Sequence, residues 1–131
     1  MTLIRSTELT DKAPYAYAGV APAGARLVFT AGACPLDSDG RTVAPGDISA
    51  QAEQVMANLR IALQAAGADL DDVLKTTVYV ASARREDLVA AWEVVSRHFG
   101  SHDAPSTLLG VSVLGYPDQL VEVEAIAAIG E

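Results

Sequence analysis

The sequence has little of the chemistry that builds disulfide bonds or metal centres. Its 131 residues include one cysteine, Cys34, and two histidines, His98 and His102. One cysteine cannot form a disulfide within the chain, and these residues match no zinc-binding spacing. The glycines stand at turn positions, and none belongs to a phosphate-binding loop motif. We therefore expect no metal and no cofactor.

Positive charge and long apolar runs are also scarce. Nine Lys and Arg residues stand against seventeen Asp and Glu residues, which gives a net charge of −8. That sign disfavours nucleic acid as a partner, because affinity for its backbone comes from basic side chains. No segment approaches the ~20 apolar residues that span a membrane, and residues 2–12 are too polar for a signal peptide. The sequence predicts a cytoplasmic protein that does not engage a membrane.

The chain does contain a regular series of strand and helix patterns, which no repeat or linker divides. Its length predicts a single domain over residues 1–131. Residues 3–6 indicate a short edge strand, and residues 16–21 and 26–31 are predicted to pair as a hairpin. The turn-rich segment 32–46 is predicted to be a loop.

Two helices flank a strand in the middle of the chain. Apolar residues recur at helical spacing in both helices, and Gly follows each of them. Between the helices, residues 74–80 alternate in a way that is typical of a strand. The predicted helix boundaries are Asp47 or Ser49 to Gly67 for the first, and Ser82 or Ala83 to Gly100 for the second.

The last quarter of the chain indicates two apolar strands, residues 105–114 and 120–129, joined by a turn as a hairpin. The second strand carries Glu122 and Glu124 among aliphatic residues. A carboxylate in such a strand is costly unless it is paired or hydrogen-bonded. The nearest candidate partner for Glu122 across the predicted hairpin is uncharged.

The order of elements, β-β-β-α-β-α-β-β, predicts an α+β sandwich of a mixed β-sheet with two helices on one face. Alternate residues of the final strand point to opposite faces of the sheet. Both sets are largely apolar, so we expect other subunits to cover the face without helices. The two sets are Val121, Val123, Ala125, Ala127 and Ile129, and Leu120, Glu122, Glu124, Ile126 and Ala128.

Several segments together, in their order and spacing, form a recognisable pattern over almost the whole chain. They are residues 14–18, 27–32, 51–66 with Asn58-Leu59, 67–80, Trp92, Pro105 and 121–127. This pattern resembles the RidA/YjgF family, also called the endoribonuclease L-PSP family. The resemblance implies a chorismate-mutase-like fold, in which three chains pack their sheets into a central barrel. It also implies a homotrimer with clefts between subunits that bind a small metabolite.

The resemblance also implies a set of cleft residues. Deaminating members of the family hydrolyse 2-imino or 2-enamino acids to 2-keto acids and ammonia. Their substrate carboxylate is clamped by an arginine two residues after the family proline, a position that Thr107 occupies here. The family's catalytic glutamate, which positions or activates water, falls on Glu122. The other implied substrate-binding positions are Ala31, Gly32, Leu109 and Tyr15, with Tyr17 as an alternative to Tyr15.

Thr107 is the main departure from the family pattern. A threonine hydroxyl offers one hydrogen bond and no charge, whereas arginine offers a charged, bidentate contact. Losing such a contact costs a few kcal/mol, on the order of 10²-fold in affinity. We therefore expect hydrolysis of common 2-imino acids to be weak or lost.

Three functions are compatible with these residues. The leading hypothesis is a divergent deaminase-like hydrolase that hydrolyses or tautomerises a small imine, enamine or carbonyl compound. The second is a non-catalytic trimer that binds a metabolite or docks on a partner. An endoribonuclease is the weakest, because the chain is acidic and shows no base-stacking platform.

Structural alternatives remain for Glu122, which could pair with Lys75 or an arginine, and for Cys34, as an inert thiol.

Overall fold

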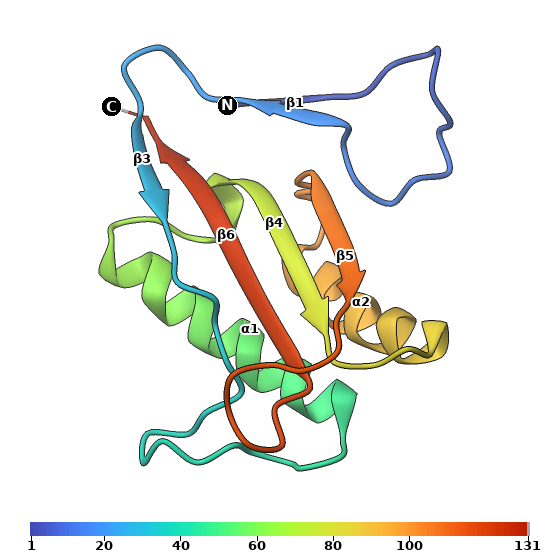
Figure 1. Ribbon diagram of the computed structural model, residues 1–131. Helices are drawn as coiled ribbons and strands as arrows, with labels where there is room; N and C mark the ends of the chain where they lie inside the picture. Colours follow the sequence, from blue (N-terminus) through green and yellow to red (C-terminus); the bar gives the residue numbers. More distant parts are fainter. Residues whose placement is uncertain (131) are drawn as a thin grey trace.

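The computed structural model describes residues 1–130, in which two helices pack on one side of a four-stranded sheet (Figure 1). A separate two-stranded ladder lies near the N-terminus. The predicted α+β class, with a mixed sheet and two helices on one face, is confirmed. The elements are β1 (Thr2–Ile4), β2 (Ala18–Val20), β3 (Arg26–Phe29), α1 (Ile48–Ala65), a 3-10 turn η1 (Leu70–Asp72), β4 (Val73–Val80), α2 (Arg85–Phe99), β5 (Ser106–Gly110) and β6 (Val121–Ile129).

The main sheet has the strand order β3-β6-β4-β5. Strand β4 pairs with β5 in parallel, and the other two pairings are antiparallel. A parallel pair needs a long crossover, and α2 provides it between β4 and β5. Strand β6 is therefore bonded on both edges, while β5 is an edge strand.

Both predicted hairpins are wrong. Strand β2 pairs with β1, and β3 pairs with β6, so the segments 16–21 and 26–31 do not pair with each other. Strand β4 separates β5 from β6, so the segments 105–114 and 120–129 do not form a hairpin either. In each case a turn signal correctly marked a change of direction. The long strand β6, however, offers both its edges to strands that are distant in sequence.

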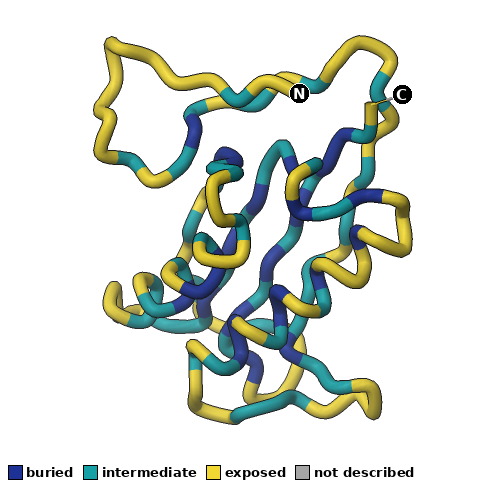
Figure 2. The backbone as a smooth tube through the Cα atoms, turned by 180° about the vertical axis from the view of Figure 1, so that it is seen from behind, coloured by how far each residue is buried: buried dark blue, intermediate teal, exposed yellow. Residues whose placement is uncertain are grey.

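The sheet buries one face against the helices. The predicted alternation in β6 is confirmed, because Val121, Val123, Ala125 and Ala127 are buried and line that face (Figure 2). The predicted alternation in β4 is confirmed from Lys75 to Val80, and the strand departs from it only at its start. An irregularity between Val73 and Lys75 shifts the register, and Val73 is buried in place of Leu74.

The two helices begin and end for local reasons. Asp47 caps α1 by accepting a hydrogen bond from Ala50 N at 3.0 Å, and Gly67 follows the helix at φ +85°. Helix α2 begins at Arg85, later than predicted, because the Ser82 hydroxyl bonds the turn before it. Within residues 1–130, neither helix is long and apolar enough to cross a membrane.

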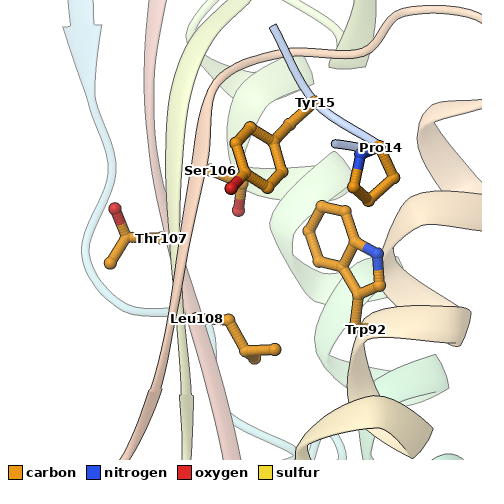
Figure 3. A pocket seen from close by; sticks show the side chains of 6 residues that line it. All are labelled: Pro14, Tyr15, Trp92, Ser106, Thr107 and Leu108. Carbon is orange, nitrogen blue, oxygen red and sulfur yellow. The ribbon is translucent and has the colours of Figure 1, made fainter. Parts of the chain in front are cut away.

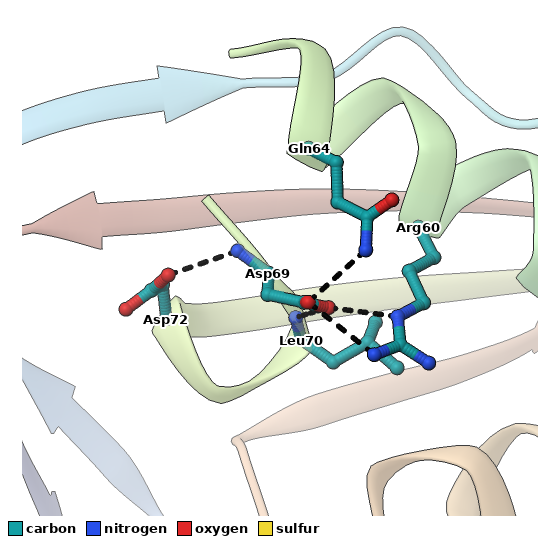
Figure 4. A network of polar contacts seen from close by, with 5 residues as sticks. All are labelled: Arg60, Gln64, Asp69, Leu70 and Asp72. Carbon is teal, nitrogen blue, oxygen red and sulfur yellow. Dashed lines mark hydrogen bonds and ion pairs between the residues drawn. The ribbon is translucent and has the colours of Figure 1, made fainter. Parts of the chain in front are cut away.

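Asp69 organises the connection from α1 to β4 (Figure 4). Its carboxylate accepts hydrogen bonds from Leu70 N at 2.8 Å, from Arg60 Nε at 3.0 Å and from Gln64 Nε2 at 3.2 Å. In return, Asp72 accepts a bond from Asp69 N at 2.9 Å, which completes a capping box. The Leu70 amide first, then Gln64 and Arg60, lower the pKa of Asp69.

We expect Asp69→Ala to reduce the free energy of unfolding by about 1 kcal/mol at neutral pH, the usual loss of a side-chain cap. Because the folded pKa of Asp69 is lowered, its stabilisation is present above the unfolded value of about 3.9 and is lost as pH falls through the folded value. The gap between wild type and variant should therefore narrow in acid. Urea denaturation at several pH values measures this. An equal loss from Asp71→Ala, an exposed neighbour in the same turn, would contradict the capping role.

Candidate functional site

The sheet face opposite the helices, hereafter the open face, is only partly covered in the single chain. It carries exposed apolar side chains, with Phe29 69% and Leu27 52% exposed on β3 and Leu109 43% exposed on β5. Polar groups lie between them on the two central strands and on β5. These are Lys75, Thr77, Tyr79, Thr107, Glu122 and Glu124.

Glu122 is held firmly on this face. Its Oε1 accepts a hydrogen bond from Gln119 Nε2 at 3.1 Å and contacts Cys34 Sγ at 3.4 Å. Its Oε2 lies against Gly32, where an added Cβ would come within 2.1 Å of that oxygen. Only glycine leaves room for the carboxylate, so the predicted pairing of Glu122 with Gly32 in one site has a steric basis.

The chain brings Gly32 to Glu122 by a local backbone pairing. After β3 ends, Ala33 N donates to Val123 O at 2.7 Å and Val123 N donates back to Ala33 O at 3.2 Å. This bridge places Gly32 beside Glu122 and leaves the predicted site residue Ala31 exposed just before it.

Two amides from α1 hold the loops around the carboxylate. Fully buried Gln51 donates to Asp118 O at 2.9 Å and accepts from Leu120 N at 2.8 Å, so it fixes the loop that carries Gln119. Asn58 donates to Cys34 O at 2.9 Å and fixes the other loop. Sequence reasoning missed Gln51 and Gln119 as contributors. The available signal was an amide on the apolar stripe of a helix, which needs a buried polar partner.

Cys34 is a proton donor to Glu122. Burial, then the hydrogen bond and negative charge of Glu122, raise the pKa of the thiol to about 11. A thiol with that pKa is protonated at neutral pH and is a poor nucleophile. The geometry therefore favours the inert interpretation of Cys34.

Thr107 lies on the open face beside a lysine. It pairs with Thr77 on β4, which in turn pairs with Glu124 on β6. Lys75 Nζ donates to Thr107 Oγ1 at 2.7 Å and to Thr76 O at 2.9 Å. Lys75 therefore donates a hydrogen bond to Thr107 and does not pair with Glu122. The partners of Glu122 are Gln119 and Cys34.

Leu109 and Tyr15 lie in different surroundings. Leu109 and Glu122 flank Tyr79 in one row across the open face. Tyr15 packs edge-on against Trp92, with ring centroids 6.4 Å apart. Figure 3 shows Tyr15 and Trp92 on one side of β5, while the Thr107 side chain points to the other.

Tyr15 borders a cavity of about 440 Å³ on the helix side of β5. Within residues 1–130 its hydroxyl makes no hydrogen bond, whereas the Tyr17 hydroxyl donates to Thr10 O at 2.6 Å. Tyr15 is thus the freer of the two candidate tyrosines. Within one chain it does not share a face with Glu122. The cavity is lined by Pro14, Tyr15, Trp92, Ser106, Thr107 and Leu108.

The fold and this arrangement define a small α+β protein with a fixed carboxylate on a sheet face that also carries exposed apolar side chains. Comparison with known families agrees with that description. The Endoribonuclease L-PSP family profile matches residues 6–129. The chain therefore belongs to this family, which is also called RidA/YjgF.

Individual relatives match over nearly their full length. A RutC family protein of Pyrococcus horikoshii is 36% identical over 92% of this chain and 93% of its own. A 2-iminobutanoate/2-iminopropanoate deaminase of Rattus norvegicus is 30% identical over 98% and 93%. The crystal structure of the Rid family protein YyfB from Yersinia pestis is 29% identical, with a TM-score of 0.86 over 98% of both chains.

We expect Gly32→Ala to displace the Glu122 carboxylate while leaving the fold intact. The added methyl group meets the flexible end of a side chain, which can rotate away. Loss of that carboxylate removes two of the three causes that raise the pKa of Cys34. The pKa should fall from about 11 toward 9, the ordinary thiol value. The pH dependence of alkylation measures this, since Cys34 is the single cysteine.

Gly115→Ala is the matched control, because an added Cβ there meets no atom within 4 Å. It should leave the Cys34 pKa unchanged. An unchanged Cys34 pKa in Gly32→Ala would show that the position of the Glu122 carboxylate does not depend on glycine at position 32.

Proposed function

We propose that this protein is a divergent RidA/YjgF-family enzyme of the cytoplasm, which hydrolyses or tautomerises a small imine, enamine or carbonyl compound. The observation that supports this most directly is the fixed carboxylate of Glu122. One oxygen is held by Gln119 and Cys34, and the other lies over Gly32. A carboxylate held in this way on an apolar face suits proton transfer to or from a small ligand.

In the proposed hydrolysis, Glu122 orients a water molecule and accepts its proton as the oxygen attacks the C=N carbon. The nitrogen takes up that proton, which gives a carbinolamine. The C–N bond then breaks as the hydroxyl passes its proton through the same carboxylate to the nitrogen, so imine and water give a carbonyl compound and ammonia. In a tautomerisation the same carboxylate moves a proton between carbon and nitrogen. The protonated thiol of Cys34 stays on Oε1 and leaves Oε2 for this chemistry.

Ordinary 2-imino acid deamination is expected to be weak. An arginine at position 107 could reach across β4 toward Glu122 and grip a substrate carboxylate with two hydrogen bonds. Thr107 and Glu122 are separated by two strand spacings, about 10 Å, which the short Thr107 side chain does not span. A 2-imino acid would therefore lack its clamp beside Glu122.

We further propose a homotrimer with ligand clefts between its copies. Support comes from the open face, where Phe29 and Leu27 are more than half exposed although they stand on a strand. Apolar groups gathered on one face mark an association surface. Tyr15, which lies on the other side of β5 from Thr107, then contributes to the cleft of a neighbouring copy.

A non-catalytic trimer that binds a metabolite or docks on a partner is the alternative. The lack of an arginine guanidinium at position 107 and the poorly nucleophilic thiol of Cys34 favour this alternative. It differs from the enzyme in one respect that can be measured, since turnover by an enzyme depends on Glu122.

Ammonia release from 2-iminobutanoate generated in situ tests the catalytic proposal. Wild type should be slow, and Thr107→Arg combined with Lys75→Met should be on the order of 10²-fold faster, because a bidentate cation returns without repulsion from Lys75. Adding Glu122→Gln should silence that double variant. Activity that survives Glu122→Gln would contradict the role of Glu122, and no gain over Lys75→Met alone would contradict the role given to position 107.

Sedimentation velocity tests the trimer. We expect wild type to sediment as three chains and Phe29→Asp to dissociate, since a carboxylate would be buried without a partner. Val113→Asp is the control, because Val113 is 78% exposed in the loop after β5. A monomeric wild type, or equal dissociation in both variants, would argue against the open face as the interface.

A further inference from the structure

Lys75 is a cation on the open face that lacks a carboxylate partner. Within residues 1–130 no ion pair involves Lys75, whereas Lys12, the other lysine, lies 3.9 Å from Asp11. The nearest acidic influence comes from Glu124, whose Oε1 already accepts a hydrogen bond from the Tyr79 hydroxyl. Burial lowers the pKa of Lys75, and the attraction of Glu124 opposes that shift. The ammonium is therefore incompletely compensated.

The ammonium and Thr107 together present two unused hydrogen-bond donors. Lys75 Nζ has three hydrogens, and its two hydrogen bonds go to uncharged oxygens, Thr107 Oγ1 and Thr76 O. Because Thr107 Oγ1 accepts from Lys75, its own hydroxyl hydrogen is free to donate elsewhere. The two donor atoms lie 2.7 Å apart. That separation suits the two oxygens of one carboxylate.

A cavity with apolar walls lies in front of this pair. Its volume is about 440 Å³, and its lining includes Tyr17, Leu74 and Ile126. One charged corner among aliphatic and aromatic walls fits an organic anion better than a fully hydrated inorganic ion. If further copies cover the open face, the ammonium loses more water, and an anionic partner then offsets a cost of several kcal/mol.

We propose that Lys75 and Thr107 form a carboxylate-binding site that takes a small aliphatic monocarboxylate. The ammonium supplies the charge from β4, and the Thr107 hydroxyl supplies the second hydrogen bond from β5. Leu74 and Ile126 contact the aliphatic chain of the ligand.

The position of this site bears on the substrate of the proposed enzyme, and this step rests on the proposed function. Thr107 and Glu122 stand on strands separated by β4, and their rows differ by two residues. Two strand spacings amount to about 10 Å. A ligand held by its carboxylate at Lys75 therefore presents to Glu122 an atom several bonds away. In a 2-imino acid the reacting carbon is next to the carboxylate, so the site favours substrates whose C=N or C=O group is remote from it.

The test is equilibrium binding of butanoate and of butanamide, its neutral isostere, followed by NMR titration of the wild-type protein. We expect butanoate to bind at least 10-fold more tightly than butanamide. Lys75→Met should weaken butanoate at least 10-fold, and Thr107→Val about 3- to 10-fold, the range for a charged and a neutral hydrogen bond. Butanamide should bind both variants as it binds wild type.

Lys12→Met is the matched control, because it removes the same charge from an exposed site and should not alter binding. Glu122→Gln should also leave butanoate affinity unchanged, so the carboxylate-binding site is tested separately from the catalytic proposal. Equal binding of the two compounds, or undiminished butanoate binding by Lys75→Met, would overturn the proposal. Dissociation of the oligomer in Lys75→Met would also overturn it, by showing that the ammonium pairs with a neighbouring copy.

Discussion

The site depends on two amide side chains on one face of α1, buried Gln51 and half-buried Asn58. Gln51 and Asn58 are seven residues apart, which is two helical turns, so both point toward the same loops. Each donates to a loop carbonyl at 2.9 Å. The first loop carries Gln119 and the second carries Cys34, and both residues contact Glu122 Oε1. Without these amides the carbonyls of Asp118 and Cys34 and the Leu120 amide would lose these hydrogen bonds, and the carboxylate would lose its support.

The open face combines an apolar surface with charges that are set apart from one another. Glu122 stands at one end of β6 and Lys75 at the other end of β4, with Tyr79 and Glu124 bonded between them. A cation, Lys75, is thus bonded to Thr107, at the position where the resemblance implies an arginine. A lysine ammonium is a point charge, whereas a guanidinium is a planar fork. The two therefore place an anion differently.

Much of the fold could be predicted because it is set by local patterns. The Asp47 cap, Gly67 and the apolar spacing between them mark α1, and strict alternation marks the two faces of β6. Strand pairing depends on distant segments, so turn signals alone predicted two hairpins that do not exist. At the site, the resemblance led to Glu122 and Gly32. The role of Gln51 was missed, and Lys75 was considered as a partner of Glu122 and not of Thr107. Gln51 acts 69 residues from Leu120, and Lys75 acts 32 residues from Thr107.

The strand order also separates positions where a substitution is costly from positions where it is tolerated. Glu122 lies on β6, which is bonded to strands on both edges, while Thr107 lies on β5, which is bonded on one. Substitutions on β6 disturb three strands and the packing of α1, whereas those on the outer face of β5 disturb few neighbours. In the proposed enzyme, Glu122 therefore lies in the most constrained part of the scaffold, together with Lys75 on β4, and Thr107 lies in the most tolerant part. Such a division allows new ligand preferences to arise through single changes at the sheet edge, without loss of foldability.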